Sequence, residues 1–244
     1  PVDLELEALR RRLKPALRRP RGDRCFHPAE RPAGTHYAEG PRYGYLAWRA
    51  GDAERLAELE RPRLVGSPAV DREVGRLLGY PRCCIDAFLE AQRRVPRRDG
   101  YWFRYALRSW SEWPHPWLNV FAREERVTLP ISHDPCRLDC AASERQASRW
   151  VEGLGAFHPT LRPALERTLR VSIALGPQGQ RARVRVDDGR VVSAEAMPGR
   201  NGRRDTVWAS RLPGTRVGRG SFRSAALIVL RCEEFPPSDD ELCL

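Results

Sequence analysis

Two short cysteine clusters, each led by a proline, constrain this chain more than any other feature of its sequence. The first occupies residues 79–84 (GYPRCC) and the second occupies residues 133–140 (HDPCRLDC). Proline is favoured in the first turn of a helix, because its missing N–H group has no helical partner there. Both clusters therefore predict thiols in a first helical turn, where free N–H groups favour the thiolate form that binds metals.

The second cluster has the signals of a helix start. An aspartate that can cap a helix precedes Pro135, and the predicted helix continues to Gly155. Cys136 and Cys140 are four residues apart, so they share one face of such a helix. His133 comes just before the cap and lies within reach of the same point.

The first cluster repeats this plan. Pro81 opens a predicted helix that ends before Pro96. Cys84 falls on the apolar face of this helix and Cys83 falls on its flank. We expect the two helix starts to meet, which brings four thiols and an imidazole together. The candidate metal ligands are Cys83, Cys84, Cys136, Cys140 and His133.

Two kinds of metal site suit these ligands. Zinc accepts four cysteines or three cysteines and a histidine, but its common signature is a pair of C-x₂₋₄-C knuckles. Adjacent Cys83 and Cys84 depart from that signature, because two neighbouring residues that hold one ion strain the peptide between them. A [4Fe–4S] cluster relaxes this strain, since its thiolates bind different irons. We favour the iron–sulfur cluster, with zinc as the alternative, and expect one of the adjacent pair to be dispensable.

Simple burial is the competing interpretation. Cysteine is among the most buried residue types, and one cysteine on an apolar helix face is usually part of the core. Four cysteines in two proline-led clusters favour the metal interpretation. The remaining cysteines are scattered and are not expected to bind the metal: Cys25, Cys232 and Cys243.

The cysteine count also bears on the compartment. Seven cysteines, two of them adjacent, do not resemble a secreted disulfide framework. No stretch approaches the roughly 18 apolar residues of a membrane span, and no signal peptide opens the sequence. We therefore expect a cytoplasmic protein with no membrane partner.

The same clusters carry a resemblance to other proteins. The motif G-Y-P-x-C-C at residues 79–84, followed by H-x-P-C-x₃-C at residues 133–140, resembles an uncharacterised group of prokaryotic proteins. The resemblance covers roughly the middle third of the chain. It implies that the two clusters belong together, and it carries no assigned activity.

The net charge of +11 raises the possibility of a nucleic-acid partner. Of the 43 basic residues, Lys14 is the single lysine, so the positive charge comes almost wholly from arginine. This arginine excess is spread along the sequence, and we interpret it as a solvated surface of a protein from a GC-rich genome. Binding to RNA or DNA stays open as a second interpretation, because arginine pairs well with phosphate.

The first two thirds of the chain is predicted to be mainly helical. Asp3 caps a helix whose leucines keep helical spacing through Leu17, and residues 20–45 are predicted to be irregular. Two further helices are predicted at residues 52–60 and 70–78. An aromatic block at residues 101–121 is expected to form core, or alternatively a stacking wall for a flat ligand.

The last third is predicted to be a small antiparallel sheet. Residues 181–186 alternate arginine with apolar residues, and an Asp-Gly turn leads into a second strand at 190–192. Further strands are expected at residues 169–175, 207–210 and 225–231. The fold class is therefore α+β, with a helical, cysteine-bearing N-terminal and central part followed by a small antiparallel β part. The expected division is 1–165 for the metal-site domain, 166–235 for the β subdomain and 236–244 for an acidic tail.

Three functions fit this sequence. The first is an iron–sulfur protein with a redox or cluster-dependent catalytic role, acting on an unidentified small molecule or redox partner. The second is a zinc-stabilised module that binds RNA or another anion through the arginine-lined strands. The third is a thiol redox switch without metal. The sequence has no dinucleotide-binding, P-loop or nucleophile-elbow motif, so it assigns no reaction and no catalytic residue.

Overall fold

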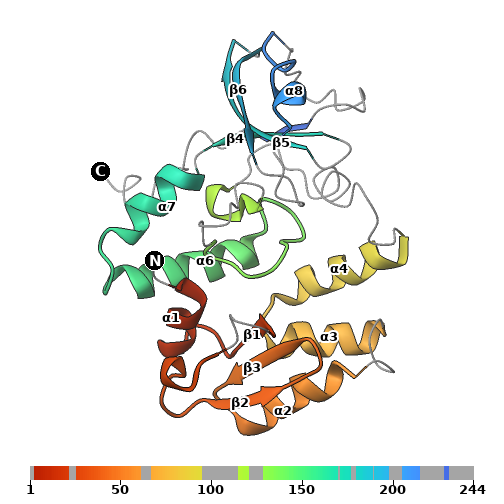
Figure 1. The fold of residues 1–244 in the computed structure, drawn as a ribbon, viewed down its shortest axis with the longest axis vertical. Helices are drawn as coiled ribbons and strands as arrows, with labels where there is room; N and C mark the ends of the chain where they lie inside the picture. The colour runs from red at the N-terminus through yellow and green to blue at the C-terminus, as the bar shows by residue number, and fades with distance from the viewer. Residues whose placement is uncertain are drawn as a thin grey trace.

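The computed structural model describes residues 3–21, 26–61, 67–94, 115–120, 129–169, 171–176, 180–188, 190–197, 205–214 and 228–230. Two small antiparallel sheets lie at opposite ends of the molecule, and the helices α6 and α7 lie between them (Figure 1). This arrangement confirms the predicted α+β class. No helix of the described residues has both the length and the apolar character that a membrane span requires.

The N-terminal part begins with a short helix and continues as a sheet. Helix α1 (Leu4–Arg10) is capped by Asp3, whose carboxylate accepts a 3.0 Å hydrogen bond from the N–H of Leu6. The predicted helical spacing through Leu17 was wrong beyond α1. The chain turns at Arg12, which has a φ of 58°, and Leu17 lies in strand β1 (Ala16–Pro20).

Residues 20–45 were predicted to be irregular, and this was also wrong. They contain a 3₁₀ turn, η1 (Pro28–Glu30), and strand β2 (His36–Glu39), and strand β3 (Tyr43–Ala47) begins in the same region. The three strands form a sheet in the order β1-β3-β2, with both pairings antiparallel. Apolar side chains of this sheet pack against the helices that follow.

Three helices continue the chain: α2 (Ala50–Leu59), α3 (Pro68–Leu77) and α4 (Arg82–Arg94). All three were predicted within a few residues. Gly79 joins α3 to α4 with a φ of +78°, a left-handed conformation that favours glycine. The short connection fixes the direction in which α4 leaves α3, and therefore the place of the first cysteine cluster.

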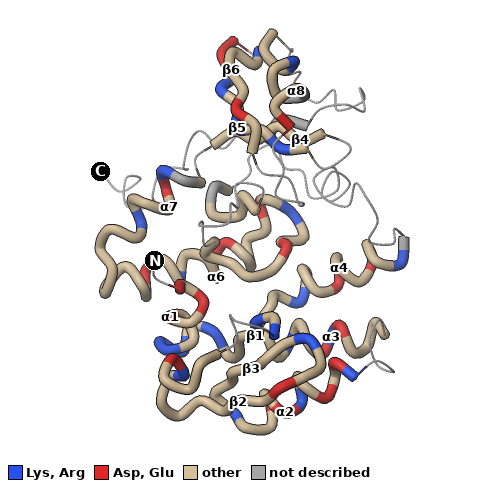
Figure 2. The backbone as a smooth tube through the Cα atoms, viewed as in Figure 1, with Lys and Arg blue, Asp and Glu red and all other residues tan. Residues whose placement is uncertain are grey.

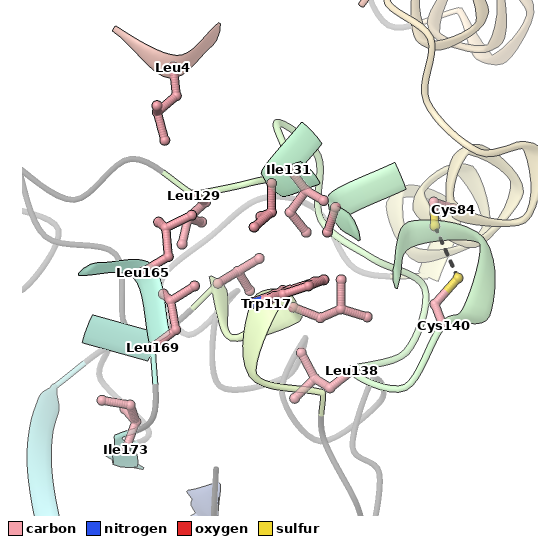
Figure 3. Close-up of a cluster of buried hydrophobic side chains, with 14 of the residues drawn as sticks. Leu4, Cys84, Trp117, Leu129, Ile131, Leu138, Cys140, Leu165, Leu169 and Ile173 are labelled. Atoms are coloured by element: carbon pink, nitrogen blue, oxygen red, sulfur yellow. Dashed lines mark hydrogen bonds between the residues drawn. The ribbon is translucent and has the colours of Figure 1, made fainter. Parts of the chain in front are cut away.

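The central part consists of a 3₁₀ turn, η2 (Pro116–Leu118), helix α6 (Ala141–Gly155) and helix α7 (Leu161–Leu169). Their apolar side chains form the largest core, which also takes in Cys84 and Cys140 (Figure 3). Trp117 is buried in this core, as expected for part of the aromatic block. The tryptophans and tyrosines of residues 101–114 lie outside the described residues.

The C-terminal sheet contains β4 (Ser172–Leu175), β5 (Arg181–Asp187), β6 (Arg190–Met197) and β7 (Ile228–Leu230), in the order β6-β5-β4-β7. The predicted β5–β6 hairpin is confirmed. The strand predicted at 207–210 is wrong, because α8 (Thr206–Ala209) occupies those residues. The strand predicted at 169–175 is shorter, because Leu169 ends α7.

The division into residues 1–165, 166–235 and 236–244 stays a prediction. Leu165, Leu169 and Ile173 lie on both sides of the expected boundary and share one core cluster. The acidic tail falls outside the described residues.

Candidate metal centre

Four cysteine sulfurs meet at one point between the N-terminal and central parts. The Sγ atoms of Cys83, Cys84, Cys136 and Cys140 all lie within 4.8 Å of one another. The Sγ of Cys83 is 3.9 Å from that of Cys84 and 3.7 Å from that of Cys140, and the Cys84–Cys140 distance is 3.8 Å. Residues more than fifty positions apart therefore form one cluster, as the sequence predicted.

Helix α4 supplies two of the thiols from its first turn. The carbonyl of Pro81 accepts 3.0 Å hydrogen bonds from the N–H groups of Cys84 and Ile85, which starts the helix. Cys84 points into the core and is 3 % exposed, whereas Cys83 is exposed. This difference was predicted from the helix face, with Cys84 as the residue suited to burial.

The other two thiols come from a loop, and the predicted helix start at Pro135 was wrong. Helix α6 begins at Ala141, and Cys140 is its N-cap residue. Cys140 closes a turn by donating its N–H to the carbonyl of Arg137 at 3.1 Å. Cys136 therefore lies on a loop rather than one helical turn before Cys140. The C-x₃-C spacing forms a knuckle that folds both sulfurs toward α4.

Buried contacts hold this loop in place. Leu138 is fully buried, and its carbonyl accepts a 2.8 Å hydrogen bond from the N–H of His115. The ammonium of Lys14 is 2.7 Å from Ser132 Oγ and 2.9 Å from Glu5 Oε1, and the lysine is only 2 % exposed. Figure 3 shows Cys84 and Cys140 facing each other at the edge of the core, with Leu138 and Trp117 to one side.

His133 lies close to the cluster without being one of the four converging groups. Its Nε2 is 2.8 Å from the Oγ of Ser143, and that Oγ is 3.2 Å from the sulfur of Cys84. The imidazole ring also packs against Tyr80, with 5.3 Å between ring centroids. His133 thus reaches Cys84 through the serine hydroxyl. The contacts of His133 with Ser143 and Tyr80 were not predicted from the sequence.

A signal for Ser143 is present in the sequence. It stands three residues after Cys140, so a helix that begins between them brings the serine back over the capping residue. Tyr80 carries no such signal, because its contact with His133 depends on how the two clusters meet.

The electrostatics of Cys84, Cys136 and Cys140 favour a mixture of thiol and thiolate. Hydrogen bonding with Cys84, together with contacts to Ser143, lowers the pKa of Cys140. The pKa of Cys84 is raised by its hydrogen bond to Cys140 and by burial, and burial also raises the pKa of Cys136. Only a cation at this point would allow all of these thiols to ionise together.

Burial lowers the pKa of His133 to about 4, so the imidazole is neutral at pH 7. A neutral ring that carries its proton on Nε2 can donate it to the Ser143 oxygen, which leaves the serine O–H to donate to the sulfur of Cys84. The pair therefore forms a hydrogen-bonded support behind one sulfur of the cluster.

Comparison with known proteins places both clusters in a common region. Residues 64–167 match a family described as Protein of unknown function (DUF483). That range contains all four converging cysteines and His133. No curated protein and no solved structure matches the chain.

Proposed function

We propose that this chain is a metal-binding protein whose four cysteines hold a single tetrahedral ion, best satisfied by Zn²⁺. The ion ties the start of α4 to the loop before α6, and so joins the N-terminal part to the central part. Four thiolates from two separated segments are a common ligand set for structural zinc.

The distances between the sulfurs carry this proposal. A tetrahedral ion with Zn–S bonds of about 2.3 Å holds its four sulfurs about 3.8 Å apart. The sulfur of Cys140 lies 3.7 Å from that of Cys83 and 3.8 Å from that of Cys84. The sulfurs of Cys83 and Cys84 are 3.9 Å apart. Three of the four sulfurs therefore have the spacing of ligands to a single ion, and the sulfur of Cys136 lies within 4.8 Å of each of them.

A [4Fe–4S] cluster, which the sequence analysis favoured, fits these distances less well. Its thiolates bind four different irons and lie farther apart than the ligands of one ion. The strain expected in the peptide between two adjacent ligands is also a weaker argument against zinc. The sulfurs of Cys83 and Cys84 lie 3.9 Å apart while both residues stay in helix α4. We therefore propose zinc in place of the iron–sulfur cluster.

The chemistry of the surroundings supports a stable site. Cys84 and Cys140 are buried, and a backbone N–H of Cys136 points at the sulfur of Cys84 from 3.3 Å. Such N–H···S contacts and a dry shell stabilise thiolates bound to a metal. The four cysteines are free thiols, which suits a reducing compartment, and we propose the cytoplasm on that ground.

Metal analysis of the anaerobically purified chain tests the proposal. We expect one equivalent of zinc and a colourless protein. Replacement of zinc by Co²⁺ should give the visible bands of a tetrahedral tetrathiolate site together with a sulfur-to-cobalt charge-transfer band. A brown protein that contains iron and acid-labile sulfide would contradict the zinc proposal and support the iron–sulfur cluster. A protein that contains no metal would contradict both and support the thiol redox switch.

Single substitutions identify the ligands. Cys84→Ser and Cys140→Ser should each abolish stoichiometric zinc binding, because a buried, incomplete thiolate site is unfavourable. Cys136→Ser should weaken it. As matched controls, Cys25→Ser, Cys232→Ser and Cys243→Ser should retain the metal. Equal loss in Cys83→Ser and Cys84→Ser would show that both adjacent cysteines bind the ion, as the single-ion site requires.

A further inference from the structure

Within the metal site, which rests on the proposed function, Cys83 differs from the three other cysteines. Cys83 is exposed, whereas Cys136 is partly buried and Cys84 and Cys140 are buried. From this asymmetry we propose that Cys83 is a nucleophilic thiolate that accepts an alkyl group from a small electrophile. The substrate class is an alkyl ester of a strong acid, in which the carbon is attacked and an anion leaves.

Access is the first requirement for such a reaction. A nucleophile must be approached by the carbon from the side opposite the leaving group, which needs open space in front of the sulfur. Cys83 lies on the outer flank of the first turn of α4, with the exposed Arg82 before it. Cys84 faces the core and cannot be reached in this way, since it is 3 % exposed.

The hydrogen bonds around the sulfurs give the second distinction. Cys84 receives an N–H from Cys136 at 3.3 Å and contacts the Ser143 hydroxyl at 3.2 Å. Donors of this kind withdraw electron density from a thiolate and lower its reactivity. In the described part of the chain, the hydrogen-bond contacts of the Cys83 sulfur are to the sulfurs of Cys84 and Cys140. Of the two sulfurs on α4, that of Cys83 therefore accepts fewer hydrogen bonds from N–H and O–H donors than that of Cys84.

The ion supplies the third requirement. Four thiolates on one divalent ion carry a net charge of −2, so each sulfur keeps much of its negative charge while it stays deprotonated. The reacting sulfur therefore needs no base.

The step balances without another reactant. The electron pair of the Cys83 thiolate forms a new S–C bond, the bond between carbon and the ester oxygen breaks, and the acid anion leaves with its electron pair. No proton is released and nothing is oxidised. The product is a thioether, which is a weaker ligand, so each chain reacts once and its metal site is altered by the reaction.

The test uses the full-length zinc-loaded protein and methyl methanesulfonate at pH 6. At this pH an ordinary thiol with a pKa near 8.5 is only about 0.3 % thiolate, so free cysteines react slowly. Zinc content is measured first, and methylation is then mapped by proteolysis and mass spectrometry. We expect Cys83 to be methylated at least tenfold faster than Cys84, Cys136 or Cys140, and at least tenfold faster than N-acetylcysteine.

A chelator-treated sample separates metal activation from simple exposure. Removal of zinc should slow methylation of Cys83 at least tenfold. A rate that is unchanged without zinc, or a zinc-loaded protein in which Cys83 reacts no faster than N-acetylcysteine, would overturn the inference and leave the metal site intact. A purified chain without zinc would overturn both the metal site and the reaction.

Discussion

Ser143 is a small buried side chain that connects the cysteine cluster to a histidine. It is fully buried, and its hydroxyl contacts both Cys84 Sγ and His133 Nε2. Among the described residues, the other ring nitrogen of His133 has no hydrogen-bond partner. Ser143 therefore holds the imidazole behind the metal site through a hydrogen bond to one of its two ring nitrogens.

We predict that Ser143→Ala lowers zinc affinity by about 10- to 100-fold, the usual effect of losing a group that supports a metal ligand. The substitution removes a hydroxyl from Cys84 and leaves His133 Nε2 unpaired in the core. Competition with a chromophoric chelator measures the affinity. Ser148→Ala, on the same helix and partly buried, is the matched control and should change affinity less than threefold. Equal affinities for the two variants would contradict the support role.

His115 is a second buried histidine, distant in sequence from the cysteines. Its Nδ1 accepts a 3.3 Å hydrogen bond from the N–H of Trp117, which requires an unprotonated ring nitrogen. Burial lowers its pKa to about 4, even though Glu144 Oε1 lies 3.8 Å from its Nε2. The unfolded chain, with an ordinary histidine pKa near 6.5, binds the proton first.

Stability should therefore fall as the pH drops from about 6.5 toward 4, by about 1.4 kcal/mol for each pH unit in this window. Above pH 6.5 both states are neutral and this contribution is constant. The measurement is the free energy of unfolding in urea for the wild type and His115→Gln across the window. The difference between the two proteins should shrink with acid, and a difference that is independent of pH would show that His115 is already protonated in the folded state.

At the scale of whole elements, a helix or hairpin could be predicted from the sequence where a local start or turn motif determines it. Helix α4 and the β5–β6 hairpin follow from a proline start and an Asp-Gly turn, and both are confirmed. The leucine at position 17 also had helical spacing, yet it lies in β1, because strand β1 pairs with β3 through Tyr45 and Leu46. Pairing with a distant strand leaves no trace in local periodicity.

The loop before α6 shows the same limit within the site. An aspartate followed by proline can start a helix or a turn, and here the helix is delayed to Ala141 by a turn from Arg137 to Cys140. Burial of Leu138 and the backbone hydrogen bond from His115 decide between the two, and both come from elsewhere in the fold. The four cysteines could be predicted to converge, but the path that brings Cys136 to the cluster could not.

Gly79 is the connecting residue on which the position of α4 depends. Its φ is +78°, and a Cβ at this position would lie 2.7 Å from Pro15 Cδ. The amide of Gln146 on α6 also donates to its carbonyl at 3.3 Å. The residue is thus fixed from both sides and sets how the first cysteine cluster faces the second.

We predict that Gly79→Ala lowers the free energy of unfolding by about 2 kcal/mol, because alanine is strained in the left-handed region and collides with Pro15. Zinc affinity should fall in the same variant, since the cluster depends on the α3–α4 turn. Gly51→Ala is the matched control: it lies in α2 with no heavy atom within 4 Å of the added Cβ, so stability should stay equal or rise by up to about 1 kcal/mol. Urea unfolding of both variants gives the comparison.

At the scale of the whole molecule, positively and negatively charged residues are interspersed along the chain (Figure 2). Many arginines of the described chain lie in ion pairs with nearby carboxylates. These pairs include Arg42 with Glu60, Arg55 with Glu73, and Arg137 with Asp139. Arginine that is neutralised locally contributes little to a field that could attract nucleic acid.

The three arginines of β5 are the best candidates for a nucleic-acid surface. Arg181, Arg183 and Arg185 alternate with the buried Ala182 and Val184, so they share one face at about 7 Å intervals. The neighbouring strand β6 adds a negative charge to this face. Its Glu195 pairs in register with Arg183 and lies 4.0 Å from the guanidinium of that arginine. The face is therefore mixed in charge rather than uniformly basic.

We accordingly predict that single-stranded RNA and duplex DNA bind only weakly, and that binding vanishes near 0.15 M salt, where the screening length is about 8 Å. Fluorescence anisotropy titrations with labelled oligonucleotides, repeated over a range of salt concentrations, measure the affinity and its salt slope. The triple substitution of Arg181, Arg183 and Arg185 by glutamine should change the affinity less than threefold, because few counterions are released at a mixed surface. A steep salt slope that this triple variant abolishes would establish the β5–β6 hairpin as a nucleic-acid surface and favour the zinc-stabilised binding module instead.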